Sequence, residues 1–141
     1  MADQNSCGAL LKQINDALEK NANNTLRPKG LTVMQMRVLL ELDQSEEGTL
    51  ALKTLEKCLR VAQSTAAGIV MRLEQKALAE GFNDKEDRRV KWVRITAAGV
   101  ACCQQADVDM CREEQGILSG LTPAERSDFL VLLKKVRDNL A

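Results

Sequence analysis

The sequence predicts a mainly helical, α+β protein in which two short strands interrupt a series of helices. Aromatic residues make up only 2% of the 141 residues, so a core must be built from aliphatic side chains, which favours packed helices. Most of the chain shows apolar residues at helical spacing. Residues 78–95 differ, because segments of strand composition lie on either side of a charged loop.

The first two helices are indicated by apolar spacing and by end signals. Residues 7–20 place several apolar side chains on one helical face, and residues 21–30, with three Asn, Pro28 and Gly30, predict a break. A second helix is expected to begin at Thr32, where Gln35 completes a capping box, and to end at residues 46–48.

Two closely spaced helices, residues 50–59 and 63–76, then predict a helix-turn-helix. The second of these has an expected inner face of Ala66, Ile69 with Val70, and Leu73. Strands are predicted over 78–82 and 90–95, around the loop 83–89, which makes a wing. Thr96 is expected to cap a helix over 97–118, and residues 122–125 open the last helix with a second capping box.

The composition argues against an enzyme. The chain has no histidine, no zinc-ligand spacing, no glycine-rich phosphate loop and no nucleophile with a base in reach. We therefore expect no catalytic residues, no metal and no cofactor. There is no apolar run long enough to span a bilayer and no secretory signal, so we expect a cytoplasmic protein without a membrane partner.

Charge is unevenly distributed although the net charge is zero. Residues 51–95 contain ten Lys and Arg against six Asp and Glu, whereas residues 1–50 and 96–141 each contain five against seven. A basic middle segment between acidic helices is what a DNA-binding lobe requires.

Three segments resemble the MarR family of transcriptional regulators: LTVMQMRVLLEL (31–42), VAQSTAAGIVMRLEQKAL (61–78) and DKEDRRVKWVRITAAG (84–99). The resemblance implies a homodimer with a single structural domain per chain. Residues 1–30 and 97–141 would form an interleaved helical dimerisation region, and residues 31–96 a winged helix-turn-helix that binds double-stranded DNA at a pseudo-palindromic operator. It further implies a repressor that a small-molecule effector or thiol oxidation releases from DNA.

The expected DNA-binding residues lie on the recognition helix and the wing. The helix offers Gln63, Ser64 and Thr65 at its N-terminal end, then Gly68 and Arg72 on its outer face. A glycine in the middle of this helix, Gly68, can be explained in two ways: it allows the helix to approach DNA closely, or it allows close packing against another helix. In the wing the candidates are Asp87, Arg88, Arg89 and Lys91, and the family pattern implies that Arg89 enters the minor groove beside an acidic neighbour.

Three positions depart from the family pattern. The usual Ser or Thr at the N-cap of the recognition helix is Ala62, and the Gly that usually follows this helix is Ala77. The Arg often found at the start of the wing strand is absent, with Glu80 and Gly81 around that place. The zero net charge and Ala62 keep an alternative open: a ligand-binding or protein-interaction module that uses the same fold without DNA.

The five cysteines allow a redox hypothesis. Free thiols that serve as small apolar residues are the default interpretation in a reducing compartment. The resemblance makes Cys7 and Cys111 the candidate redox residues, because the two could form a disulfide between subunits of an interleaved dimer. Against this, the chain has no tyrosine to orient such a thiol.

Overall fold

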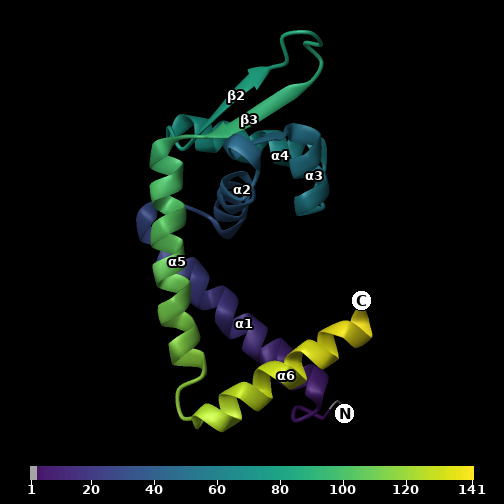
Figure 1. The fold of residues 1–141 in the computed structure, drawn as a ribbon, viewed down its shortest axis with the longest axis vertical. Helices are drawn as coiled ribbons and strands as arrows, with labels where there is room; N and C mark the ends of the chain where they lie inside the picture. The colour runs from purple at the N-terminus through teal and green to yellow at the C-terminus, as the bar shows by residue number, and fades with distance from the viewer. Residues whose placement is uncertain (1–2) are drawn as a thin grey trace. The chain divides into compact units, whose positions relative to one another are not determined.

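Residues 3–141 are described by a computed structural model, which contains six α-helices and three short strands (Figure 1). The elements are α1 (Cys7–Leu26), α2 (Val33–Asp43), β1 (Thr49–Ala51), α3 (Leu52–Leu59), α4 (Gln63–Gln75), β2 (Ala79–Asn83), β3 (Lys91–Ile95), α5 (Ala97–Ile117) and α6 (Pro123–Leu140), with 3₁₀ turns at Arg27–Lys29 and Glu46–Gly48. The chain divides into two compact units, one ending at Gln105 and the other covering Ala106–Ala141. The order of helices and strands confirms the predicted mainly helical fold with a winged helix-turn-helix.

The helix starts follow the local capping chemistry that the sequence predicts. The Thr32 hydroxyl accepts a hydrogen bond from the Gln35 backbone N–H at 3.1 Å, and the Gln35 side chain accepts one from the Thr32 N–H at 3.3 Å. Thr122 and Glu125 form the same reciprocal pair at the start of α6. Both capping boxes are confirmed, because each depends only on residues three apart.

The predicted end of the first helix is wrong. The break was expected from Asn21, but α1 continues to Leu26 and only then passes into the 3₁₀ turn that contains Pro28. Leu18, Ala22 and Leu26 repeat at a spacing of four, and the three side chains are the half-buried or buried positions of this half of the helix. Burial of this stripe outweighs the low helix propensity of the asparagines.

The sheet has a third strand that the sequence analysis missed. β1 pairs antiparallel with β3 in the order β1-β3-β2, with Leu50 opposite Val93 and Gly81 opposite the same residue on β2. The helix expected to begin at Leu50 therefore begins at Leu52. A three-residue strand carries too little periodicity to be predicted, and it exists only because β3 supplies its hydrogen-bond partners.

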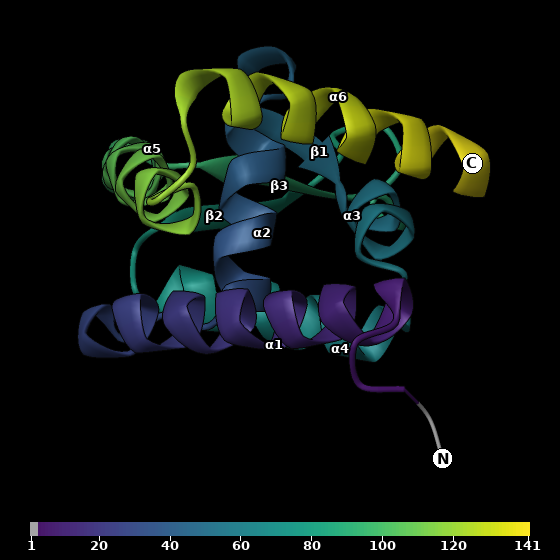
Figure 2. The same cartoon turned by 90° about the horizontal axis from the view of Figure 1, so that it is seen from below.

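The core of the first unit lies between α2, α3, α4 and the sheet, with α2 at its centre in the view of Figure 2. Leu39, Leu42, Leu55 and Leu73 are completely buried there. On α4 the predicted inner face needs one correction: Val70 is the buried residue and Ile69 is only half-buried, beside Ala66 and Leu73 as expected. The remaining face of α4 is thus left to solvent.

Gly99 fixes the way that α5 leaves the sheet. A Cβ at this position would lie 2.3 Å from the Leu78 carbonyl oxygen and 2.6 Å from Ile95 Cγ1. The Thr96 hydroxyl accepts from the Gly99 N–H at 3.1 Å and donates to the Ala77 carbonyl at 2.8 Å. The helix start is therefore packed directly on the backbone that follows α4, which only glycine permits.

Apolar side chains remain exposed on the terminal helices. α1 exposes Leu10, Leu11 and Ile14, and in the second unit α6 exposes Leu130, Val131, Leu132, Val136 and Leu140. Within residues 3–141, no helix is both long enough and apolar enough to cross a membrane.

Candidate nucleic-acid interface

The N-terminal end of α4 presents polar side chains and unsatisfied backbone donors to solvent. Gln63, Ser64 and Thr65 are all exposed in its first turn. Ala62 is the N-cap, and it has no side-chain oxygen to accept a bond from the N–H groups of this turn. A helix start with free N–H groups and short polar side chains is suited to phosphate and to base edges.

Gly68 has open space around its Cα. A Cβ built there would meet no atom of another element within 4 Å. Packing against another helix of this chain, one of the two interpretations of this glycine, is therefore excluded for residues 3–141. One turn further along, the Arg72 guanidinium is exposed and makes no hydrogen bond or ion pair within the described chain.

The C-terminal end of α4 is tied to the start of α2. Lys76 Nζ donates to Gln35 Oε1 at 2.8 Å and to the Gly30 carbonyl oxygen. Gln35 is the buried polar residue of the core, with only 3% of its surface exposed. Sequence analysis missed this bridge, because Gln35 is recognisable in the sequence only as a capping-box residue and nothing marks Lys76 as its partner until folding brings the two helices together.

The wing loop, residues 84–90, is organised around the Asp84 carboxylate. Asp84 Oδ2 accepts from the backbone N–H groups of Glu86 at 3.1 Å and Asp87 at 3.0 Å. Its Oδ1 accepts from the Trp92 indole N–H at 3.1 Å. The Asp87 N–H, followed by the Trp92 and Glu86 donors, holds the pKa of the Asp84 carboxyl below its ordinary value.

Asp87 in turn holds Arg89. The Arg89 backbone N–H and Nε both donate to Asp87 Oδ1 at 3.1 Å, and Nη2 donates to Oδ2 at 3.3 Å. This side-chain pairing, and then the backbone bond, keeps the pKa of Asp87 below its ordinary value. Arg88 is exposed and makes no such bond within residues 3–141, so the loop carries one held and one unpaired guanidinium.

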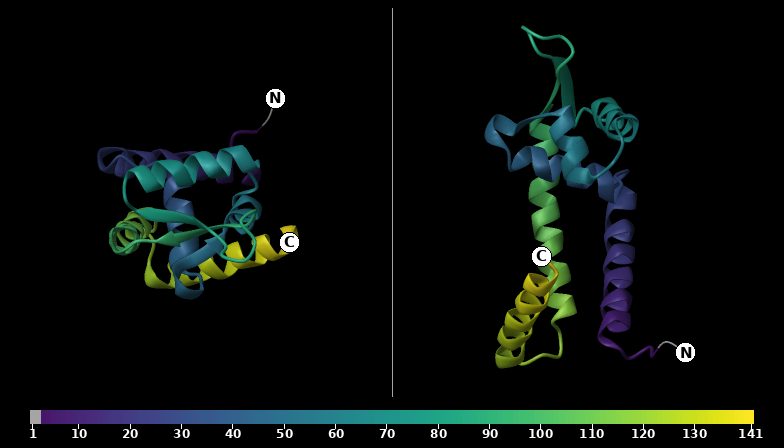
Figure 3. Two further views of the ribbon diagram at one scale, coloured as in Figure 1. Left: turned by 90° about the horizontal axis from the view of Figure 1, so that it is seen from above. Right: turned by 90° about the vertical axis from the view of Figure 1, so that its right-hand side faces the viewer.

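The loop extends beyond the helices of the first unit in Figure 1 and in the right panel of Figure 3. Lys91 is half-buried on β3, with its stem beside Gly81, and Lys85 is exposed in the loop. All nine predicted DNA-binding residues therefore lie on α4, on the wing loop or on β3. Sequence analysis missed Asp84 and Trp92. Asp84 could have been found, because an Asp side chain in a polar loop commonly accepts a hydrogen bond from the backbone N–H two residues later and so marks a turn.

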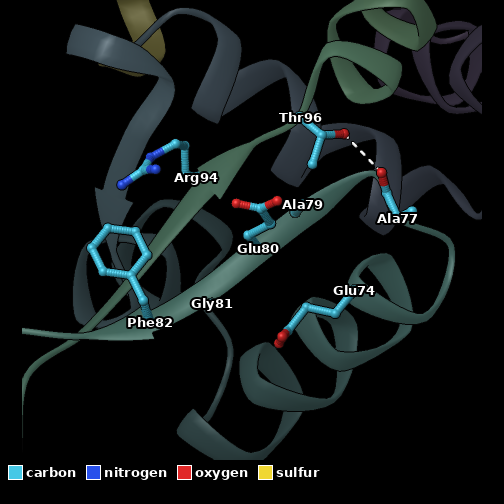
Figure 4. A pocket seen from close by; sticks show the side chains of 8 residues that line it. All are labelled: Glu74, Ala77, Ala79, Glu80, Gly81, Phe82, Arg94 and Thr96. Atoms are coloured by element: carbon cyan, nitrogen blue, oxygen red, sulfur yellow. Dashed lines mark hydrogen bonds between the residues drawn. The ribbon is translucent and has the colours of Figure 1, made fainter.

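A surface hollow lies between α4 and the wing strands (Figure 4). The Arg94 guanidinium stands over the Phe82 ring, 4.6 Å from its centre, and the Thr96–Ala77 hydrogen bond closes one end. Glu74 and Glu80 supply two carboxylates to the lining. The Arg94–Phe82 contact covers an aromatic ring on the outer face of the sheet and thereby stabilises the base of the wing.

The candidate redox cysteines are both exposed, Cys7 at the start of α1 and Cys111 on α5. Cys103 is buried and Cys58 is exposed on α3. Among residues 3–141 no cluster of three or more His, Cys, Asp or Glu side chains is placed to hold a metal ion.

Comparisons with known proteins agree with this geometry. A sequence model of the MarR family matches residues 29–90, from the turn before α2 to the end of the wing loop. The multiple antibiotic resistance protein MarR of Salmonella typhimurium is 28% identical over 130 residues, which are 92% of this chain and 89% of that protein.

Two solved structures extend the comparison. The Bordetella bronchiseptica protein BpsR, described as a DNA-binding protein regulated by 6-hydroxynicotinic acid, is 29% identical, with a TM-score of 0.74 over 98% of this chain and 97% of that one. A mutant of Escherichia coli MarR complexed with operator DNA is 27% identical, with a TM-score of 0.72 over 92% and 91% of the two chains.

Proposed function

We propose that the chain is a winged-helix transcriptional regulator of the MarR family, and that it is a repressor that binds a specific double-stranded operator as a homodimer. The observation that carries the proposal is the solvent-facing side of α4. Its first turn offers exposed polar side chains and unsatisfied N–H groups, and Gly68 opens the backbone to close approach. The similar MarR structure with operator DNA supports the same mode of binding.

The wing supplies the second contact in this proposal. Arg89, held by Asp87, enters the minor groove, while Arg88 and Lys91 lie beside the phosphates. Because a dimer presents two recognition helices, the operator consists of two half-sites about one helical turn apart. Such a regulator acts where the bacterial chromosome is, in the cytoplasm.

The dimer is supported by apolar surface on the terminal helices. The exposed leucines and valines of α6, and the Leu10, Leu11 and Ile14 side chains of α1, are costly to leave in water. Sedimentation velocity at micromolar concentration is expected to give twice the 15.6 kDa mass of one chain. A species of one chain's mass would contradict the dimer and the palindromic operator together.

DNA binding is tested by fluorescence anisotropy on the duplex upstream of the chain's own gene, beside a scrambled duplex, at several salt concentrations. Arg89→Ala is expected to weaken binding, and to reduce the slope of log K against log salt by about one if the Arg89 guanidinium also neutralises a phosphate. Arg137→Ala is the matched control, because Arg137 also forms an exposed ion pair with an adjacent carboxylate, Asp138, at 3.1 Å. It lies on α6, outside the proposed DNA interface; once sedimentation velocity has shown that this variant is still a dimer, its affinity and slope are expected to equal those of the wild type.

Either outcome decides between two classes of protein. Tight, salt-sensitive binding to the upstream duplex alone establishes a specific regulator. Equal and weak binding to both duplexes, with no effect of Arg89→Ala, would favour the module that uses the fold without DNA, for which the zero net charge and Ala62 are the motives.

Release by a signal completes the proposed function. For a small-molecule effector, the first probe is 6-hydroxynicotinic acid, since BpsR is described as regulated by it. Loss of anisotropy on addition of this compound would support an aromatic acid effector. For thiol oxidation, peroxide treatment is expected to give a dimer on a non-reducing gel that Cys7→Ser does not form; an unchanged pattern would contradict the redox mechanism.

A further inference from the structure

The wing loop has little hydrophobic burial to hold its conformation, because Val90 at its end is its one apolar residue and is only half-buried. Lys85, Glu86, Arg88 and Arg89 are all exposed, so their ordering costs conformational entropy that packing does not offset. The loop backbone makes only two hydrogen bonds across itself, from the Asp84 N–H to Val90 O at 2.9 Å and from the Val90 N–H to Asp87 O at 3.0 Å. Its geometry must therefore depend on side-chain acceptors.

The Asp84 carboxylate is the acceptor that connects the loop to the sheet. One oxygen receives the N–H groups of Glu86 and Asp87, and the other receives the indole N–H of Trp92. Trp92 lies on β3, opposite Phe82 on one side and Ala51 on the other, so it is part of the sheet itself. The turn of the loop is thus fixed to the sheet through a single side chain.

The chain of contacts continues to the arginine. Asp87, whose N–H Asp84 fixes, is the residue whose carboxylate receives three donors of Arg89. We propose that Asp84 is a positioning residue for DNA binding, which holds the wing loop so that Arg89 is presented to the groove in a preformed geometry. This inference rests on the proposed function, and it assigns a role to a residue that touches no DNA.

Simple charge repulsion and a positioning role predict opposite changes in DNA affinity when the Asp84 carboxylate is removed. A carboxylate near a phosphate backbone is repelled, so if charge alone counted, Asp84→Ala would tighten binding. If Asp84 positions the loop, the same change releases two backbone N–H groups and the indole, and we expect specific binding to weaken about ten-fold. Glu86→Ala is the matched control, since Glu86 is an exposed neighbouring carboxylate whose side chain makes no hydrogen bond or ion pair within residues 3–141.

Asp84→Asn separates the two halves of the role. An amide oxygen can still accept from the Glu86 and Asp87 N–H groups, but the amide NH₂ cannot accept from the indole. We expect this variant to bind DNA with an affinity between those of the wild type and Asp84→Ala.

Trp92 gives a readout that needs no DNA. The chain has one tryptophan and no tyrosine, so tryptophan emission of the free protein reports on this strand alone. Both Asp84 variants are expected to change the Trp92 spectrum, whereas Glu86→Ala is not. Far-ultraviolet circular dichroism and the thermal midpoint confirm that each variant is folded.

The combination of the two readouts decides the inference. Weaker binding together with a changed Trp92 spectrum supports it. Binding as tight as that of Glu86→Ala or tighter overturns it, whatever the spectrum shows. If the wild type binds no duplex specifically, the proposed function fails, and an unchanged Trp92 spectrum would then overturn the loop-holding role as well.

Discussion

Lys76 Nζ donates a hydrogen bond of 2.8 Å to the buried Oε1 of Gln35, from a position 41 residues later in the chain. The same amide oxygen completes the capping box at the start of α2. The end of the recognition helix is therefore bonded to a polar group at the edge of the core, which limits the freedom of α4 to turn on its neighbours.

Lys76→Met tests this bridge, because methionine keeps the aliphatic stem and removes the ammonium. We expect the free energy of unfolding to fall by about 1–2 kcal/mol, as hydrogen bonds to a charged donor are lost beside a buried acceptor. Urea unfolding measures it. Lys53→Met on the exposed side of α3 is the control and is expected to stay within about 0.5 kcal/mol of the wild type. Equal effects of the two changes would show that the bridge contributes nothing.

Ala62→Ser is expected to stabilise the protein by about 1 kcal/mol, because the serine oxygen can accept a free N–H at the start of α4. Thermal unfolding checks this as an increase of a few degrees in the midpoint. Ala62→Val, which adds bulk without an acceptor, is expected to give no increase. A midpoint as high for valine as for serine would show that the cap is not the cause.

Gly68→Ala is expected to raise stability and lower DNA affinity at once. Open space around the Cα lets alanine gain about 0.5–1 kcal/mol of helix propensity, while a methyl group on the outer face of α4 obstructs the groove. Gly116→Ala on α5, also without neighbours within 4 Å, provides the comparison. Unchanged affinity for the operator in the Gly68 variant would contradict close approach of α4 to DNA.

Ala77→Gly is expected to stabilise the end of α4. Ala77 has a φ of 59°, in the left-handed region that penalises a Cβ. Relief of this strain exceeds the added freedom of the unfolded chain, which leaves a gain of about 0.5–1 kcal/mol in chemical unfolding. The same substitution at Ala101, exposed within α5, is expected to destabilise by about 1 kcal/mol. A loss at both positions would place Ala77 outside the left-handed region.

The wing should lose its order only in acid. The pKa values of Asp84 and Asp87 are lowered in the folded protein, so the stability they contribute is present above the ordinary aspartate pKa of about 4 and is lost as pH falls through their folded values. Trp92 emission is therefore expected to be constant from pH 8 to 5 and to change below about pH 4. Asp84→Asn should remove most of this transition, and an equal transition in that variant would assign it to other groups.

Several features were predictable because they depend on near neighbours. The capping boxes at Thr32 and Thr122 involve residues three apart, and the wing loop is recognised by its density of charge. Features that depend on distant partners were not. β1 is a strand only because Trp92, Val93 and Arg94 lie opposite it, and the asparagines of α1 are helical only because Leu26 is buried.

The sequence by itself determined the order of the elements, the helix-turn-helix and the residues that face solvent on α4 and the wing, since helix periodicity and capping are local properties. Only the tertiary structure decided what those residues do to one another. It showed that a Cβ at Gly68 would meet no other element, that Lys76 reaches Gln35, and that Asp84 joins the loop to Trp92. The reason is physical: a hydrogen bond or a close approach between residues far apart in sequence exists only after the core has brought their backbones together.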